Sequence, residues 1–380
     1  MTDIANPASA PGLTTRQALP IWTMLFPVLS VIAVLAGLAK LGALGTIAAA
    51  VILIGAVIAA VHHAEVVAHR VGEPFGTLVL AVAVTVIEVS LIVSLMLAEP
   101  SAGPAGTPGA ASSLARDTVF AAIMIILNGI IGLCLLVGGL RHHEQRFTLR
   151  GMSAALCVLA AMAVLSLVLP NYTSSVAGPV YSSSQLIFTA IVSLILYVTF
   201  VLVQTVSHRD YFLPSGDVEE KDGHAPPPTD PAAWSAFGLL LIALIGVVLL
   251  AKGLSPTVEK AVLDAGLPLT VVGIVIAGLV LAPESLAAYR AARRDRLQTS
   301  LNLALGSALA TIGLTIPAVA IVSLVLGLPL SLGIDLKSIT LLALSLFVAT
   351  LSLGTGRTTV LQGAVHLVIF AAYLFTTVVP

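Results

Sequence analysis

Residues 78–94 read LVLAVAVTVIEVSLIVS, an apolar run that carries a single carboxylate, Glu88. Residues 271–288 read VVGIVIAGLVLAPESLAA and also carry one carboxylate, Glu284. Apolar runs of about 18 to 25 residues are long enough to cross a hydrocarbon core about 30 Å thick. Both stretches therefore indicate membrane-spanning helices with one acidic side chain inside each.

The composition of the whole chain is that of a membrane protein. Of its 380 residues, 58% are hydrophobic and only 9% are charged, and the mean hydropathy is +1.09. This is more apolar surface than one soluble core can bury, so we expect the lipid bilayer to be the main solvent. A formal net charge of -1 and the lack of a long basic tract exclude nucleic-acid binding as a function.

Eleven apolar runs qualify as spans, and they predict an all-α polytopic membrane protein with about 11 transmembrane helices. Their approximate starts are residues 21, 43, 75, 117, 152, 185, 234, 267, 297, 337 and 359. A cytoplasmic N-terminus places twelve of the 17 Lys and Arg residues on the cytoplasmic side, as the positive-inside rule requires. The C-terminus is then predicted on the outer side.

Polar segments divide the spans into sets. Residues 1–20 lack the features of a signal peptide and are expected to form a disordered cytoplasmic tail, followed by a leading helix in residues 21–42. Residues 207–233 are acidic and Pro-rich, which is typical of a disordered cytoplasmic linker. Five spans lie in residues 43–206 and five in 234–380, and because five is odd the two sets would be inverted repeats.

Internal similarity between the two sets is weak but present. Arg116-Asp117 leads into a span with Asn128-Gly129, and Arg294-Asp295 leads into a span with Gly306-Ser307, twelve residues on in each case. A helix with one glutamate precedes each pair. The pattern predicts one leading helix plus two inverted five-helix repeats.

Glu88 and Glu284 need a functional explanation. We place sixteen of the 18 acidic residues in tails, loops or helix ends, which leaves these two well inside spans. A carboxylate at the bilayer centre costs at least about 2.5 to 3.5 kcal/mol on insertion scales, although a protonated glutamate that joins two helices is the structural alternative. Carboxylates bind hard cations such as Ca²⁺, and removal from water favours their protonated form. Competition between a cation and protons for one site is what exchange requires.

Neighbouring groups are candidates for auxiliary ligands or a proton relay. Pro283 has no N–H, which frees the carbonyl of Leu279 near the proposed ion, although a packing kink is the alternative. Glu73, at the start of the third span, suits either a helix cap or a gate or relay. For the other candidates, hydrogen bonding between helices is the competing role. These are Thr85, Asn128, Gln298, Asn302, Ser307 and His366.

Other classes of function have less support in the sequence. Cys134 and Cys157 lie in apolar runs without C-x-x-C spacing, and we expect them to pack. An intramembrane enzyme is a remote alternative because the sequence contains neither H-E-x-x-H nor a recognisable nucleophile with its base. A channel would share the acidic residues, but one carboxylate in each of two related helices suits a closed alternating-access site better. We expect no permanently bound cofactor.

Five motifs carry a resemblance to a known family: Gly72-Glu73-Pro74-Phe75-Gly76-Thr77, Val86-Ile87-Glu88-Val89, Ala282-Pro283-Glu284-Ser285, Gly306-Ser307 through Pro317, and Gly356-Arg357 through His366. On these residues the chain resembles the bacterial Cha-type calcium/proton antiporters of the cation/calcium exchanger superfamily. It departs from the vacuolar branch, because Thr85 and Leu281 stand where that branch has asparagines.

The resemblance implies an eleven-helix exchanger with inverted repeats in the bacterial inner membrane, with many helices crossing the bilayer. It further implies export of Ca²⁺ from the cytoplasm against proton entry, with Glu88 and Glu284 as the one essential glutamate of each repeat. Since this branch is also associated with Na⁺ or K⁺ exchange for protons, a Na⁺(K⁺)/H⁺ antiporter that uses the same site is the main alternative. The expected partners are inorganic cations, protons and the lipid bilayer.

Overall fold

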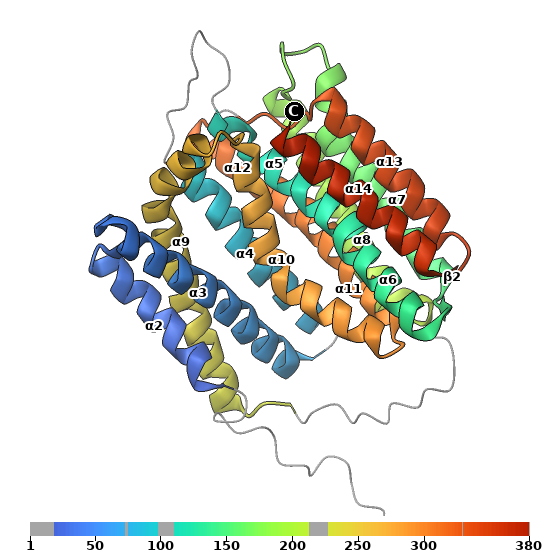
Figure 1. The fold of residues 1–380 in the computed structure, drawn as a ribbon, viewed down its shortest axis with the longest axis horizontal. Helices are drawn as coiled ribbons and strands as arrows, with labels where there is room; N and C mark the ends of the chain where they lie inside the picture. The colour runs from blue at the N-terminus through green and yellow to red at the C-terminus, as the bar shows by residue number, and fades with distance from the viewer. Residues whose placement is uncertain (1–18, 73–74, 98–109, 213–226, 329, 380) are drawn as a thin grey trace, which may run out of the picture. The chain divides into compact units, whose positions relative to one another are not determined.

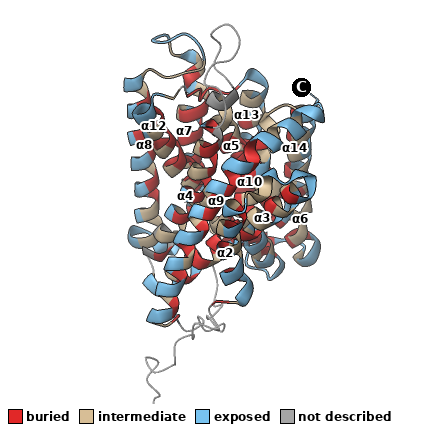
Figure 2. Cartoon of the chain, turned by 90° about the vertical axis from the view of Figure 1, so that its left-hand side faces the viewer, coloured by how far each residue is buried: buried red, intermediate tan, exposed pale blue. Residues whose placement is uncertain are grey.

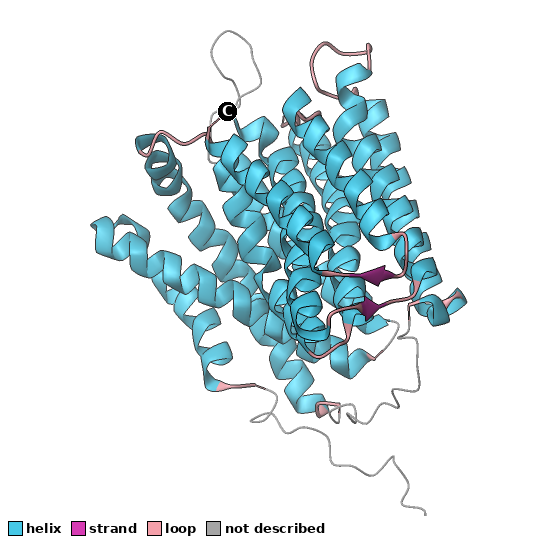
Figure 3. Cartoon of the chain, turned by 45° about the vertical axis from the view of Figure 1, so that its right-hand side comes forward, coloured by secondary structure: helices cyan, strands magenta, loops and turns pink. Residues whose placement is uncertain are grey.

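The computed structural model describes residues 19–72, 75–97, 110–212, 227–328 and 330–379. These residues are helical almost throughout, with one short antiparallel pair of strands, β1 (Gln145–Arg146) and β2 (Arg357–Thr358) (Figure 3). The all-α prediction is therefore confirmed. Most of the predicted N-terminal tail, and residues 213–226 of the predicted linker, lie outside the described residues.

Each of the eleven predicted spans falls on a helix. Two are short apolar helices, and the described residues contain nine further helical runs long and apolar enough to cross a membrane. The α-helices are α2 (Ile21–Leu35), α3 (Gly42–Val71), α4 (Phe75–Met96), α5 (Ala110–Met124), α6 (Ile131–His142), α7 (Leu149–Ala163), α8 (Ser183–Leu202), α9 (Asp230–Asp264), α10 (Thr270–Arg293), α11 (Leu297–Ala310), α12 (Ile316–Leu326), α13 (Leu336–Leu353) and α14 (Val360–Val378).

Several spans change helix type along their length. Segments of π-helix, in which one extra residue widens the turn, continue or connect α-helices. They are η4 (Ile125–Ile130) between α5 and α6, η5 (Val164–Val168) after α7, η7 (Val203–Ser207) after α8, and η9 (Thr311–Thr315) between α11 and α12. Short 3₁₀ turns are η2 (Leu38–Lys40), η6 (Leu169–Tyr172) and η8 (Arg209–Tyr211).

The chain folds into two compact units. Unit 1 comprises Met1–Val84 and Asp217–Leu250, and unit 2 comprises Thr85–Gly216 and Ala251–Pro380. Helices α4 and α9 each begin in unit 1 and continue into unit 2. Both intramembrane glutamates belong to unit 2.

Unit 1 is built on the packing of α2 against α3. Gly55 of α3 leaves room for the ring of Phe26, which a side chain there would displace. His63 of α3 is fully buried, and its Nε2 lies 2.8 Å from the carbonyl oxygen of Thr23. Arg70 at the end of α3 donates from Nε to Asp230 at the start of α9, at 2.7 Å. These contacts tie three helices of unit 1 together.

Unit 2 is held by close helix pairs. Helices α6 and α14 run side by side (Figure 1), and they approach so closely that a Cβ at Gly132 would lie 2.8 Å from the Cβ of His366. Helix α10 packs along α5, where Gly273 lies directly against the backbone of Asp117. Small residues permit such contacts between membrane helices, where lipid removes the hydrophobic drive for association.

Large apolar side chains line the outward faces of the helices. Along α8 in particular, exposed positions alternate with buried ones (Figure 2). The exposed ones include Ile187, Phe188, Ile191, Ile195 and Leu202. Such a face is expected where the surrounding medium is lipid rather than water.

Candidate functional site

Glu88 is the buried acid around which the site is built. It lies in α4 with 3% of its surface exposed, and its Oε2 accepts a hydrogen bond of 2.8 Å from the hydroxyl of Thr315. Thr311 forms a second hydrogen bond with the same carboxyl group. Both threonines come from the π segment η9, and both are buried.

The sequence of η9 explains why the helix is irregular there. Pro317, in the first turn of α12, has no N–H to donate and its ring crowds the carbonyl four residues earlier. That carbonyl belongs to Gly313, whose missing side chain leaves space for Tyr197 of α8. The π segment thus places Thr311 and Thr315, four residues apart, against one carboxylate.

Glu284 lies inside α10, as predicted, and is partly buried. Its carboxylate interacts electrostatically with that of Glu88, so the two acids belong to one polar centre. Pro283 sits within α10 and offers no N–H to the carbonyl of Leu279, while Ser285 donates to the carbonyl of Leu281 at 2.6 Å.

Two contacts, one before and one after Glu284 in the sequence of α10, show which part of the neighbouring helix lies beside it. Helix α10 runs parallel to α5, η4 and α6, because Gly273 lies against Asp117 and His142 Nε2 lies 3.2 Å from the carbonyl oxygen of Arg293. Glu284 falls between these two contacts, and η4 falls between them on the other helix. Since α10 packs on both η4 and α6, residue counting from these two contacts puts Glu284 level with the region where η4 joins α6.

Asn128 is the buried polar residue of η4. Its Nδ2 donates to Ser345 Oγ of α13 at 2.8 Å, and its Oδ1 lies 3.2 Å from His366 Nδ1 of α14. The structure therefore brings two of the predicted residues, Asn128 and His366, into one buried cluster.

The remaining predicted residues fall in different places. Thr85 is buried on α4 three residues before Glu88, and Ser307 is partly buried on α11 four residues before Thr311. Glu73 lies outside the described residues.

Gln298 and Asn302 are engaged at the end of unit 2 where α11 begins. Gln298 Oε1 accepts from the Thr148 N–H at 2.6 Å and its Nε2 donates to Asn302 Oδ1 at 3.0 Å. Asn302 Nδ2 in turn donates to the carbonyl of Phe212 at 2.6 Å. These bonds join α11 to the segments after β1 and η8.

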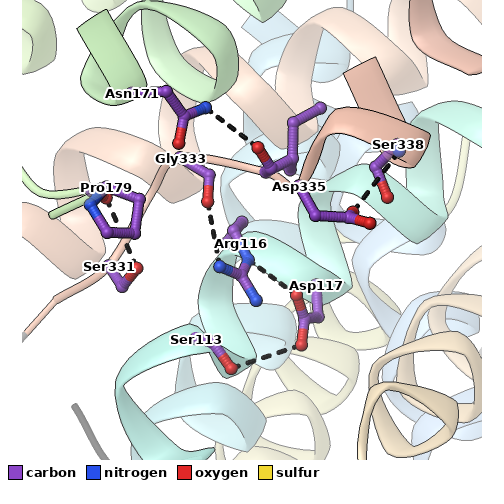
Figure 4. A network of polar contacts seen from close by, with 10 residues as sticks. Ser113, Arg116, Asp117, Asn171, Pro179, Ser331, Gly333, Asp335 and Ser338 are labelled. Atoms are coloured by element: carbon purple, nitrogen blue, oxygen red, sulfur yellow. Dashed lines mark hydrogen bonds and ion pairs between the residues drawn. The ribbon is translucent and has the colours of Figure 1, made fainter. Parts of the chain in front are cut away.

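A second network lies at the opposite end of unit 2, where α5 begins (Figure 4). Arg116 pairs with Asp117 at 2.8 Å and also donates to the carbonyl of Gly333 at 2.9 Å. Asn171 donates to the carbonyl of Ile334 at 2.9 Å. Asp117 is predicted at a helix start, but it lies within α5 and its side chain is only 12% exposed. Its counter-ion Arg116, one residue earlier, explains why burial is tolerated.

The candidate site residues that sequence reasoning missed are Thr311 and Thr315. Their signal is a Thr-x-x-x-Thr spacing directly before Ile316-Pro317, which puts two hydroxyls on one helix face next to a helix-distorting proline. Within the described residues no three His, Cys, Asp or Glu side chains gather to hold a metal. The centre is instead two carboxylates with hydroxyl partners.

A multi-helix membrane fold with two acids inside its helices is typical of a membrane transporter. Residues 41–206 and 235–379 match the model of the sodium/calcium exchanger protein family, and the chain belongs to that family of cation exchangers. The intramembrane-enzyme alternative is thereby excluded.

Known relatives agree with this assignment. The chain is 48% identical over 378 residues to the putative ionic transporter y4hA of Sinorhizobium fredii (strain NBRC 101917 / NGR234), covering 97% of this chain and 99% of that protein. It is 34% identical over 361 residues to the sodium-potassium/proton antiporter ChaA of Escherichia coli (strain K12), covering 93% and 95%. The solved structure of native YfkE shares the fold, with a TM-score of 0.70 at 19% identity, covering 95% of this chain and 99% of that one.

Proposed function

We propose that this protein is a cation/proton antiporter that exports Ca²⁺ from the cytoplasm in exchange for H⁺. The observation that carries the proposal is the environment of Glu88: a carboxylate inside an apolar helix, 3% exposed, that accepts a hydrogen bond from Thr315 and is near enough to Glu284 for their charges to interact. Two carboxylates that share one centre provide two negative charges when ionised and none when both are protonated. This is the charge change that exchange of one divalent cation for protons requires.

The oxygen atoms of the centre suit a hard cation. Carboxylate, hydroxyl and main-chain carbonyl oxygens are the ligands that Ca²⁺ prefers, in a flexible shell of six to eight. Glu88, Glu284 and Thr315 supply the first two kinds, and the Leu279 carbonyl supplies the third. A Thr315 hydroxyl that donates to the carboxylate can instead turn a lone pair to the cation, because its O–H rotates freely. Thr85 and Ser307 are further candidate ligands.

Alternating access through inverted repeats is part of the proposal. In residues 43–206 and in residues 234–380, the third span of each set contains a π segment, η4 or η9. Glu88 of the first set bonds to η9 of the second, while Glu284 of the second lies level with the end of η4 of the first. Such a crossed arrangement is expected when two inverted halves build a site near the midplane of the membrane.

The proposed orientation has the N-terminus in the cytoplasm and the C-terminus on the outer side of a bacterial inner membrane. The distribution of Lys and Arg over the predicted loops supports it. Protons would then enter from the outer side as Ca²⁺ leaves. No permanently bound cofactor takes part in this scheme.

A Na⁺(K⁺)/H⁺ antiporter is the second candidate. The specific observation in its favour is the 34% identity to the sodium-potassium/proton antiporter ChaA over 93% of this chain. The same carboxylates and hydroxyls would hold a monovalent cation, with one proton exchanged for each charge.

The test is proton flux in liposomes that contain the purified full chain and a pH-sensitive dye. Addition of Ca²⁺ should dissipate an imposed pH gradient, and the half-saturating concentrations of Ca²⁺, Na⁺ and K⁺ rank the two candidates. Glu88→Gln and Glu284→Gln should each abolish the response, whereas Glu144→Gln, at an exposed position directly before β1, should not. A full response from both site variants would overturn the proposed function.

A further inference from the structure

A second buried polar cluster lies in unit 2, separate from the hydroxyls that bind Glu88. It consists of Asn128 from η4, Ser345 from α13 and His366 from α14, and none of the three has any exposed surface. Buried polar groups between membrane helices are costly unless they are hydrogen-bonded. The bonds within this cluster therefore carry information on its role.

The direction of each hydrogen bond in this cluster follows from the bond that Ser345 makes to the main chain. Ser345 Oγ has two acceptors in reach, the carbonyl of Leu341 at 2.7 Å and Met124 Sδ at 3.5 Å. Its only proton is donated to one of these two, and the carbonyl is the stronger acceptor, so Ser345 presents lone pairs to Asn128. The Asn128 amide must then place its NH₂ towards Ser345 and its Oδ1 towards His366. Since Oδ1 only accepts, His366 must donate from Nδ1.

This direction defines the tautomer of the imidazole. A neutral ring with its proton on Nδ1 carries a lone pair on Nε2. Nε2 is buried and has no hydrogen-bond partner within the described residues, as expected for an acceptor that faces apolar surroundings. The hydrogen bonds are thus donated from His366 to Asn128, from Asn128 to Ser345, and from Ser345 to the Leu341 carbonyl.

No charged group pairs with this ring among the described residues. The elements packed against α14 are α6, η4, α10 and α13, and α5 reaches it through the contact of Phe120 with Tyr373. The titratable residues on these elements and on α14 itself are Arg116, Asp117, Cys134, Arg141, His142, Glu284, Tyr289, Arg290, Arg293, Lys337 and Tyr373. The described hydrogen bond of the His366 side chain is the one to Asn128. A charged ring would also carry a proton on Nε2, which has no acceptor within the described residues, so the neutral ring is favoured.

We propose that His366 is a positioning residue of the exchanger, which as a neutral Nδ1–H imidazole holds the side chain of Asn128 in the π segment that ends level with Glu284. This inference rests on the proposed function for its transport consequences, but its structural part does not. A proton relay through the cluster is unfavourable because the amide of Asn128 neither accepts nor releases protons readily. The close contact of Gly132 with the Cβ of His366 fixes the ring relative to the same helix run, α5–η4–α6.

The structural part is tested by NMR on the full chain with ¹⁵N-labelled histidine in lipid nanodiscs. The His366 signal is assigned by its absence from the His366→Gln spectrum. We expect a protonated Nδ1 and an unprotonated Nε2 between pH 6 and 8. A ring protonated on Nε2, or on both nitrogens, would overturn the assignment.

The transport part is tested by two variants in the liposome assay. The amide N–H of His366→Gln can donate to Asn128 Oδ1, so exchange should stay within about threefold of the wild type, with an unchanged pH profile. Exchange by His366→Leu, which cannot donate, should be about tenfold slower, as expected for one lost buried hydrogen bond. Equal rates for the two variants would overturn the positioning role.

These outcomes can be separated from failure of the proposed function. Retained exchange in Glu88→Gln and Glu284→Gln would contradict the proposed function. The tautomer of His366 measured by NMR does not depend on that result. Ser352→Ala, at a buried position seven residues beyond Ser345 on α13, is the matched control for a polar deletion and should leave both readouts unchanged.

Discussion

Two of the four described π segments of unit 2, η4 and η9, stand in different relations to the two glutamates. Segment η9 puts Thr311 and Thr315 directly on the carboxylate of Glu88. Segment η4 ends level with Glu284, but its buried Asn128 is bound to Ser345 and His366 of the neighbouring helices. In the two proposed repeats, corresponding π segments therefore have different polar partners.

The largest expected effect is loss of exchange when either glutamate is replaced. Glu88→Gln and Glu284→Gln should each lower exchange at least about a hundredfold, because removal of one charge leaves a buried site without the field that binds the cation. Dye-reported proton flux in liposomes measures the loss. Substantial exchange in only one variant would show that a single π segment and its glutamate suffice.

The pH dependence shows whether both segments serve proton-exchanging acids. Protons and cation compete, so the half-saturating cation concentration should rise as pH falls, by up to about tenfold per pH unit for each proton displaced. A limiting slope of two protons would mean that both carboxylates exchange, and a slope of one that only one does. A half-saturating concentration independent of pH would contradict competition altogether.

Thr315→Val tests the direct contact made by η9. Valine keeps the shape but removes the hydroxyl, and loss of one hydrogen bond to a buried carboxylate should change the half-saturating cation concentration by about tenfold. Thr315→Ser keeps the hydroxyl and should restore wild-type behaviour. Thr350→Val, on the exposed side of α13, is the control. Equal cation binding by Thr315→Val and the wild type would argue against η9 as part of the site.

The smallest effect concerns the packing that holds η4 and its cluster in place. A Cβ at Gly363 of α14 would clash with the backbone of Leu136 in α6, so Gly363→Ala should cost about 1 to 3 kcal/mol of stability. Thermal unfolding in detergent measures the change. Gly238→Ala in α9, where the added Cβ meets no atom within 4 Å, should unfold like the wild type.

Much of the fold was readable from hydropathy alone. All eleven predicted spans coincide with helices, because the bilayer demands both an apolar surface and an internally bonded backbone. The helix type along each span was not predictable in the same way. Pro317 marks η9, but no proline lies in η4, which packs against α10, α11, α13 and α14.

The burial of Arg116-Asp117 and of Arg294-Asp295 could not be predicted from the sequence pattern that the two pairs share. The first pair lies inside α5, with the acid buried against its arginine. The second lies in the turn between α10 and α11, where Asp295 accepts from Gln145 at 2.8 Å. Identical dipeptides thus occupy different environments, because burial is set by neighbours that are distant in sequence.

By itself the sequence determined that the chain spans a membrane and that Glu88 and Glu284 are its exceptional residues, since a charge inside an apolar run is costly wherever the helix packs. Only the tertiary structure decided which partners these acids have. Thr315 is 227 positions from Glu88 along the chain, and Asn128 is 238 from His366. Such contacts depend on helix packing and crossing, which small residues such as Gly132, Gly273 and Gly363 permit but do not specify.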